Sequence, residues 1–435
     1  MKEIIGRNFF PEKMVPRVLS FFFFAWMISF FWGFLGYEWI IRGIELAVPV
    51  LSLIYLFSLK RKIKITIPAI ALYVYIMMMM AIAYLADVKT PYTGTLYLKT
   101  IYYFISASVS SYAFYEYLTR RRDRISEFCS LIPFFSACVI VAICILAFQL
   151  SWRPGQSLIG TYIGDSYQGV SRVLGLCVLI MACFRREVIF FMRWPIILVG
   201  ILLLFALQSF GAFFAVILAA VFYARYHVGI RSWVFICLAL LMLVVVFPFP
   251  EWLGSLDKNK FIDRFYGKLQ FSSLGVEQDR LWLMTAGLKQ WVGDIESFIF
   301  GVGPMKFACN VGYCDAYRHP HNIFVGVVVW FGVTGVPLAY IVIRALIKSI
   351  AGFLLSNEPF MIFISGITLN CFLLSFVGGD FEQNRQLIFL LVFMLLIGKR
   401  LNKSGGRWVF VERDEIKEES HRGSQSVLTR GFVMR

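Results

Sequence analysis

Long apolar runs, separated by short polar segments, make up most of this chain. Each run is about 17 to 25 residues long, which is the length a helix needs to cross the hydrocarbon core of a bilayer. We count twelve runs, at approximately residues 18–36, 40–59, 65–86, 98–118, 127–150, 168–184, 192–208, 210–226, 232–249, 322–343, 350–377 and 386–398. No cleavage site of small residues follows the first run, so we expect an anchor helix there rather than a signal peptide.

The Lys and Arg residues test this count, because they concentrate in the cytoplasmic loops of membrane proteins. With the N-terminus in the cytoplasm, 28 of the 42 basic residues fall on the inner side, including the clusters at 60–64 and 120–124. An odd number of helices would break this alternation. The sequence therefore predicts an all-α integral membrane protein with about twelve transmembrane helices and both termini in the cytoplasm.

The composition agrees with this class. Hydrophobic residues make up 59% of the chain and charged residues only 16%, whereas soluble domains carry about 25% charged residues. The many aromatic residues suit a lipid-facing surface with interfacial belts. A disordered, collagen-like or disulfide-rich secreted protein is excluded. The net charge of +16 follows from the cytoplasmic excess of basic residues, so it does not indicate a nucleic-acid partner.

The polar segments divide the chain into four parts. Residues 1–248 hold the first nine spans, 249–320 form one large outer loop between helices nine and ten, 321–398 hold the last three spans, and 399–435 form a cytoplasmic tail. The tail is highly charged and lacks an apolar period, so we expect it to be disordered. No internal repeat relates the two halves, which counts against the common transporter folds.

The outer loop contains one predicted helix. Leu281, Met284, Leu288 and Trp291 fall on a single stripe at helical spacing between residues 278 and 291. A helix at the outer membrane interface fits this stripe, and an ordinary packed helix outside the membrane fits it equally well.

Cys309 and Cys314 lie late in the same loop. On the oxidising side of the membrane they are close enough in sequence to form a disulfide, and the sequence leaves paired and unpaired thiols equally open. A zinc site with His319 and His321 is less favoured, because the spacing matches no common zinc motif. The other seven Cys fall in or beside spans, where small apolar packing explains them.

His319 and His321 stand where the outer loop enters the tenth span. Pro320 biases His319 away from helical geometry, and a helix begins directly after His321. The positive end of a helix favours anions and lowers the pKa of a nearby imidazole. Such a neutral His acts as a general base near physiological pH. A His that only caps the helix is the alternative.

Arg residues at the outer ends of spans are candidates for binding an anion. Arg172 lies about one turn inside the sixth span, where an Arg is costly unless it snorkels or meets a partner. Arg280 borders the apolar stripe of the loop helix, and an ion pair with Glu277 or Asp279 explains it as well. The weaker candidates, which a charged loop also explains, are Arg264 and Arg385.

Several short motifs together resemble one family. His321-Asn322-Ile323-Phe324 followed by Gly332-Val333-Thr334-Gly335 resembles the His-Asn and Gly-x-x-Gly signature of the O-antigen ligase and O-antigen polymerase superfamily. Upstream, Arg280-Leu281-Trp282 and the Gly-x-Gly segment Gly301-Val302-Gly303 resemble two further motifs of that family. The order of the motifs, the large late loop and the twelve-helix plan also agree. The detailed resemblance covers about residues 280–340.

The resemblance implies an enzyme of bacterial surface-polysaccharide assembly in the inner membrane, with its active site facing the periplasm. The donor would be an undecaprenyl-diphosphate-linked glycan, and no metal or other cofactor would be needed. His321 would be the catalytic base that deprotonates the acceptor hydroxyl, and attack opposite the diphosphate would invert the anomeric carbon. Candidates for binding the diphosphate or sugar are Arg280, Arg172, His319, Arg318, Asn322 and Arg264.

One motif departs from the family pattern. Family members often carry Ser-Arg-Gly between the seventh and eighth helices, whereas this chain has Ser209-Phe210-Gly211. If that Arg holds the diphosphate in relatives, another outer Arg such as Arg172 must do so here.

The sequence leaves the acceptor open. A ligase would transfer the glycan to lipid A-core, and a polymerase would transfer it to a second lipid-linked glycan; we favour the ligase slightly. A transporter would instead carry charged residues near the bilayer midplane, where this chain has few. A non-catalytic assembly subunit remains an alternative if His321 is dispensable.

Overall fold

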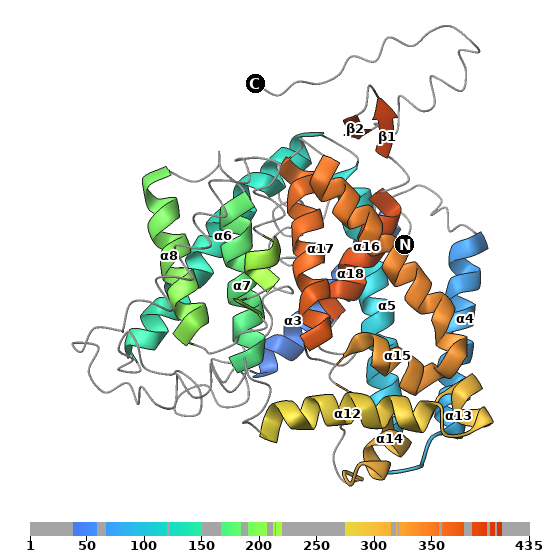
Figure 1. Cartoon of the computed structure of the whole chain (residues 1–435). Helices are drawn as coiled ribbons and strands as arrows, with labels where there is room; N and C mark the ends of the chain where they lie inside the picture. The colour runs from blue at the N-terminus through green and yellow to red at the C-terminus, as the bar shows by residue number, and fades with distance from the viewer. Residues whose placement is uncertain are drawn as a thin grey trace, which may run out of the picture.

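The computed structural model describes residues 38–58, 67–119, 122–149, 167–183, 190–206, 212–213, 215–219, 275–314, 319–320, 322–355, 359–377, 385–397, 401–404 and 407–410. Helices dominate this part of the chain (Figure 1). They are α3 (Glu38–Ser58), α4 (Ile67–Ala86), α5 (Thr93–Leu118), α6 (Arg122–Gln149), α7 (Tyr167–Cys183), α8 (Phe190–Ala206), α12 (Gly275–Trp291), α13 (Ile295–Phe300), α14 (Pro304–Asn310), α15 (Ile323–Phe331), α16 (Val336–Leu355), α17 (Pro359–Val377) and α18 (Arg385–Ile397).

The helical class predicted from the sequence is confirmed for the described residues. Helices α3 to α8 coincide with the predicted runs from 40–59 to 192–208 within a few residues, and α18 coincides with the last run. One continuous helical stretch, Ile323–Gly352, is long and apolar enough to cross a bilayer, and several shorter apolar helices accompany it. The predicted runs 18–36 and 232–249 lie outside the described residues, as does most of 210–226.

The tenth predicted span is not one straight helix. A 3-10 turn, η3 (Gly332–Gly335), separates α15 from α16, and Figure 1 shows the two helices diverging from that turn. The break has a local cause, because Gly332 adopts a positive φ of 56° and Pro337 favours the first turn of a new helix. The predicted span 322–343 falls within this helical stretch, and η3 divides it into two helices.

The boundary between the tenth and eleventh predicted spans is wrong. α16 continues to Leu355, and α17 begins at Pro359, where proline favours the first turn of a helix. Arg344 and Lys348, which fall between the predicted runs 322–343 and 350–377, lie on α16.

The main buried core lies among α5, α6, α7, α17 and α18. Its aromatic members interlock: the rings of Phe114 and Phe393 are 5.2 Å apart, and those of Phe114 and Phe128 are 5.1 Å apart. Edge-to-face and tilted pairs of this kind suit the ring quadrupole. This core joins helices from both halves of the chain into one bundle.

Arg193 of the neighbouring helix α8 caps the C-terminal end of α7. Its Nε donates to the carbonyl of Met181 at 2.8 Å, and an Nη donates to the carbonyl of Ala182 at 2.6 Å. The last carbonyls of a helix lack intrahelical partners, and the helix dipole favours a cation there. Arg193 falls at the start of the predicted span 192–208 and is a buried residue of α8.

Helices α12, α13 and α14 gather at one end of the bundle, and Figure 1 shows α12 lying across that end. At the opposite end of the picture, β1 (Leu401–Ser404) and β2 (Arg407–Phe410) form an antiparallel hairpin that pairs Leu401 with Phe410. The expectation of a disordered tail stays a prediction, because the rest of 399–435 lies outside the described residues. Gly405-Gly406 separates the two strands in the sequence, and Gly-Gly is favoured in two-residue hairpin connections.

Candidate functional site

The two glycine motifs of the sequence meet in space, although about thirty residues separate them. A Cβ built on Gly301 would lie 2.5 Å from the carbonyl carbon of Trp330, and one on Gly332 would lie 2.5 Å from the amide nitrogen of Gly301. Gly301 has a φ of 87° and Gly332 a φ of 56°, a region that side chains disfavour. Only glycine fits at both positions.

This contact lets the Gly-x-Gly segment cap the end of α15. The amides of Val302 and Gly303 both donate to the carbonyl of Val329, at 2.7 and 3.0 Å. That carbonyl belongs to the last turn of α15, where carbonyls lack partners within the helix. On the other side of the turn, the hydroxyl of Tyr75 on α4 donates to the carbonyl of Thr334. The turn is thus held from the Gly-x-Gly segment and from α4.

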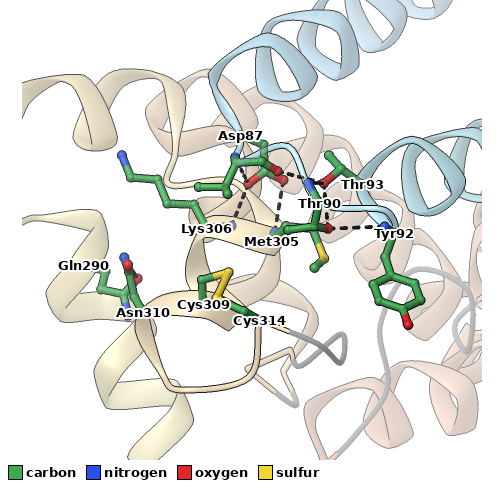
Figure 2. Close-up of a disulfide and its surroundings, with 11 residues drawn as sticks. Asp87, Thr90, Tyr92, Thr93, Gln290, Met305, Lys306, Cys309, Asn310 and Cys314 are labelled. Carbon is green, nitrogen blue, oxygen red and sulfur yellow. Dashed lines mark hydrogen bonds between the residues drawn. A yellow bond between two sulfur atoms is a disulfide. The ribbon is translucent and has the colours of Figure 1, made fainter.

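Asp87, at the end of α4, holds α14 in place across 218 residues of sequence (Figure 2). Its carboxylate accepts from the amides of Met305 at 3.0 Å and Lys306 at 2.6 Å. These amides belong to the first turn of α14 and need an acceptor from outside the helix. A Cβ on Gly303 would lie 2.8 Å from Cγ of Asp87, so glycine gives the carboxylate its access.

Asp87 is buried, with 4% of its surface exposed. Burial raises the pKa of its carboxyl above the ordinary value, and the hydrogen bonds from Met305, Lys306, Val88 and Tyr97 act in the opposite direction. The hydroxyl of Tyr97 donates to Oδ2 of Asp87 at 3.3 Å, and its ring lies 5.7 Å from that of Trp330 on α15. Tyr97 therefore connects the capping carboxylate to α15.

Helix α12 packs against α15 through a small residue. A Cβ on Gly287 would lie 3.0 Å from a methyl group of Val329 and 3.3 Å from one of Val325. The predicted helix is confirmed, but its predicted stripe is only partly buried. Met284 is half-buried, whereas Leu288 is 41% exposed. Periodicity alone gave no weight to Gly287, where the two helices approach closely.

Arg280 lies on α12, one turn before Leu283 and Met284. Helix positions three, four and seven apart share a face, so position 280 shares the face of Leu283, Met284 and Gly287. That face meets α15. Its side chain lies outside the described part of the structure, as do Arg264, Arg318 and the proposed base His321.

The start of α15 is set by Asn322. Its Oδ1 accepts from the amides of Phe324 at 2.9 Å and Val325 at 3.2 Å, which is a standard N-cap. The cap therefore uses the side-chain oxygen of Asn322, the residue that we named as a candidate for substrate binding. His319, three residues earlier, is half-buried. His319 and Asn322, the described residues on either side of His321, thus lie at the N-terminus of α15. The dipole of a helix favours negative charge at that end.

Arg172 on α7 lies close to α17. The guanidinium of Arg172 on α7 acts electrostatically on the thiol of Cys371 on α17. The next residue, Phe372, packs edge-to-face with Phe324 of α15 at 5.6 Å between ring centroids. Arg172 is half-buried. The structure therefore places Arg172 beside α17, on the face of α7 that packs against it.

A disulfide joins Cys309 and Cys314, with their Cα atoms 4.1 Å apart (Figure 2). It closes the turn after α14, and Asn310 ties that turn to α12 through a hydrogen bond of 3.0 Å from its Nδ2 to Oε1 of Gln290. In this form neither sulfur is a thiolate, so the pair offers no zinc ligands. Among the described residues, no cluster of three or more His, Cys, Asp or Glu side chains has the arrangement of a metal site.

Sequence reasoning missed Asp87 and Tyr97. Nothing near Asp87 in the sequence marks it as a cap, because its partners lie in the outer loop more than two hundred residues later. The one available signal was a carboxylate at the outer end of an apolar run. Comparison with known proteins adds no assignment: no protein-family model matches the chain, and no curated protein matches it.

Proposed function

We propose that this protein is a membrane-embedded glycan transferase of the O-antigen ligase type. It transfers an undecaprenyl-diphosphate-linked glycan to a sugar hydroxyl of lipid A-core at the periplasmic face of the bacterial inner membrane. The observation that carries the proposal is the contact between Gly301 and Gly332. Two motifs on which the family resemblance rests are one structural unit here, and that unit holds the helix that follows His321.

The proposed topology has support from contacts at the bundle ends. The twelve-span plan places the segment after α4 and the 249–320 loop on the same outer side. Asp87 of the first contacts Met305 and Lys306 of the second. The β1–β2 hairpin, which the plan places in the cytoplasm, lies at the opposite end from α12–α14 (Figure 1).

In the proposed reaction, His321 takes the proton of the acceptor hydroxyl. The hydroxyl oxygen forms a bond to the anomeric carbon while the bond from that carbon to the diphosphate breaks. The diphosphate leaves with the electron pair, and the attack from the opposite side inverts the carbon. Arg172 and Arg280 bind the leaving diphosphate, because guanidinium groups pair with phosphate oxygens through two hydrogen bonds.

The test is complementation of a strain that lacks this gene. His321→Ala, expressed at the wild-type level, is expected to abolish long surface polysaccharide, since general-base catalysis contributes about 100- to 10,000-fold in rate. His421→Ala, in the tail, is the matched control and should behave as wild type. Normal polysaccharide in the His321→Ala strain would overturn the catalytic assignment.

The lipopolysaccharide ladder on a gel identifies the acceptor. Loss of all long chains with accumulation of lipid-linked polymer supports a ligase. Core bearing a single repeat instead supports a polymerase, which would use a second lipid-linked glycan as its acceptor. Arg172→Lys separates charge from geometry: it keeps the cation but loses the paired hydrogen bonds, so we expect a weaker apparent affinity for the donor.

A further inference from the structure

Helix α13 exposes a contiguous apolar surface. Ile295, Phe298 and Ile299 recur at the spacing of one helical face, and Val292 precedes them; all four are exposed. The opposite side of α13 carries Ser297, which is buried and donates to the carboxylate of Asp294. We call the four apolar residues the α13 face.

The α13 face adjoins other exposed apolar surface. α13 packs directly on η3, and the chain continues from η3 into α16, where Val336, Tyr340, Ile343 and Ile347 are also exposed. The stretch Ile323–Gly352 is long and apolar enough to cross a bilayer, and only 33% of its most apolar part is buried within the protein. A surface so apolar and so little covered by protein fits lipid.

Trp291 marks where this surface ends. Its ring stacks on Phe298 with the ring centroids 5.3 Å apart, and its Nε1 donates to the carbonyl of Phe298 at 3.1 Å. An aromatic residue with an apolar body and a satisfied polar tip is typical of the boundary between hydrocarbon and water. Asp294 and Glu296, which are exposed beside it, belong on the aqueous side of that boundary.

We propose that the α13 face is immersed in the outer leaflet of the bilayer, so that the outer loop is anchored in lipid at the Gly301–Gly332 contact. The partner is a phospholipid surface. This inference rests on the membrane-spanning architecture of the proposed function, and it adds an anchoring site in a segment predicted to lie outside the spans. The anchor fixes the loop at the level where a lipid-linked donor presents its diphosphate.

Photo-crosslinking of the full-length protein in phospholipid vesicles tests this. p-Benzoylphenylalanine in place of Ile299 should form a phospholipid adduct, detected by mass spectrometry. The matched control is the same substitution at Tyr313, which has a similar exposure of 39% against 40% but follows α14 beside the disulfide. We expect at least five times more lipid adduct at position 299 than at 313.

Crosslinking at a third position distinguishes failure of the α13 anchor from failure of the membrane-spanning architecture. Tyr340, exposed on α16, should react with lipid if α16 crosses the bilayer. Lipid adducts at 340 but not at 299 would overturn the α13 anchor and leave the membrane architecture standing. Protein crosslinks at 299 would also overturn it, because a second copy would then cover the face. No adduct at either position would overturn both.

Discussion

Gly301 and Gly332 lie backbone to backbone, and each occupies the space that a side chain on the other would need. Through this contact the outer loop rests on the turn between α15 and α16. The same loop segment then caps α15 through Val302 and Gly303 and receives the carboxylate of Asp87 at α14. A single close approach therefore organises the outer end of the bundle.

Alanine at either glycine should destabilise the protein strongly. Gly301→Ala and Gly332→Ala each add backbone strain of about 1–3 kcal/mol, and the new methyl group also meets main-chain atoms that cannot move aside. We expect a fall in thermal unfolding temperature in detergent and loss of activity. Gly312→Ala is the matched control, because Gly312 has a φ of 88° but no atom within 4 Å of its Cβ position. Alanine at 312 should therefore add backbone strain without a steric clash. Equal effects at 301 and 312 would contradict the role of the contact.

Substitutions of Asp87 should distinguish the stability that comes from its hydrogen-bond acceptors from the stability that comes from its charge. Asp87→Ala leaves the amides of Met305 and Lys306 without their acceptor and should cost about 1–2 kcal/mol of stability. Asp87→Asn keeps an acceptor oxygen and should cost less. Unfolding temperatures of the two variants in the same detergent give the comparison.

The stability of the wild type should also depend on the titration of Asp87. Because burial raises the pKa of Asp87 above the value of 3.8, the folded protein binds this proton more readily than the unfolded chain does. Proton binding by Asp87 therefore stabilises the folded protein fully below about pH 4. This stabilisation is lost as the pH rises through the raised pKa of Asp87. Relative to wild type, Asp87→Asn should gain stability between pH 4 and neutrality. A relative loss over that range would contradict the raised pKa.

The disulfide should protect two thiols and stabilise the outer loop. Denatured protein should take up two more maleimide groups after reduction than before, which mass spectrometry can count. The paired substitution Cys309→Ala with Cys314→Ala should cost about 2 kcal/mol, the chain-entropy value for so short a loop. Equal maleimide uptake with and without reductant would exclude the bond.

Arg193 should contribute to stability without any role in the reaction. Arg193→Met removes both donors to the end of α7 and the cation that its dipole favours, at a cost of about 1–2 kcal/mol. Arg344→Gln is the control, since Arg344 is exposed on α16 and should change stability by less than about 0.5 kcal/mol. Polysaccharide assembly by the folded fraction should be normal in both variants.

The sequence by itself determined the helical class and the positions of most helices. The apolar runs predicted α3 to α8 and α18 closely, because apolar length and helical periodicity are properties of neighbouring residues. It also marked Gly301, Gly303, Gly332 and Gly335 as unusual. It could not say that Gly301 meets Gly332, since a motif does not reveal its partner.

Only the tertiary structure decided how the outer end is assembled. Gly332 and Pro337 mark the break at η3 locally, but only folding brings Gly301 into the space beside Gly332. Asp87 became a helix cap because folding brings it to amides more than two hundred residues away. Arg193 became a buried cap because the packing of α8 on α7 brings it to the carbonyls at the end of α7. Local patterns fix which residues form helices, whereas unsatisfied amides and carbonyls at the helix ends are matched only when distant segments pack together.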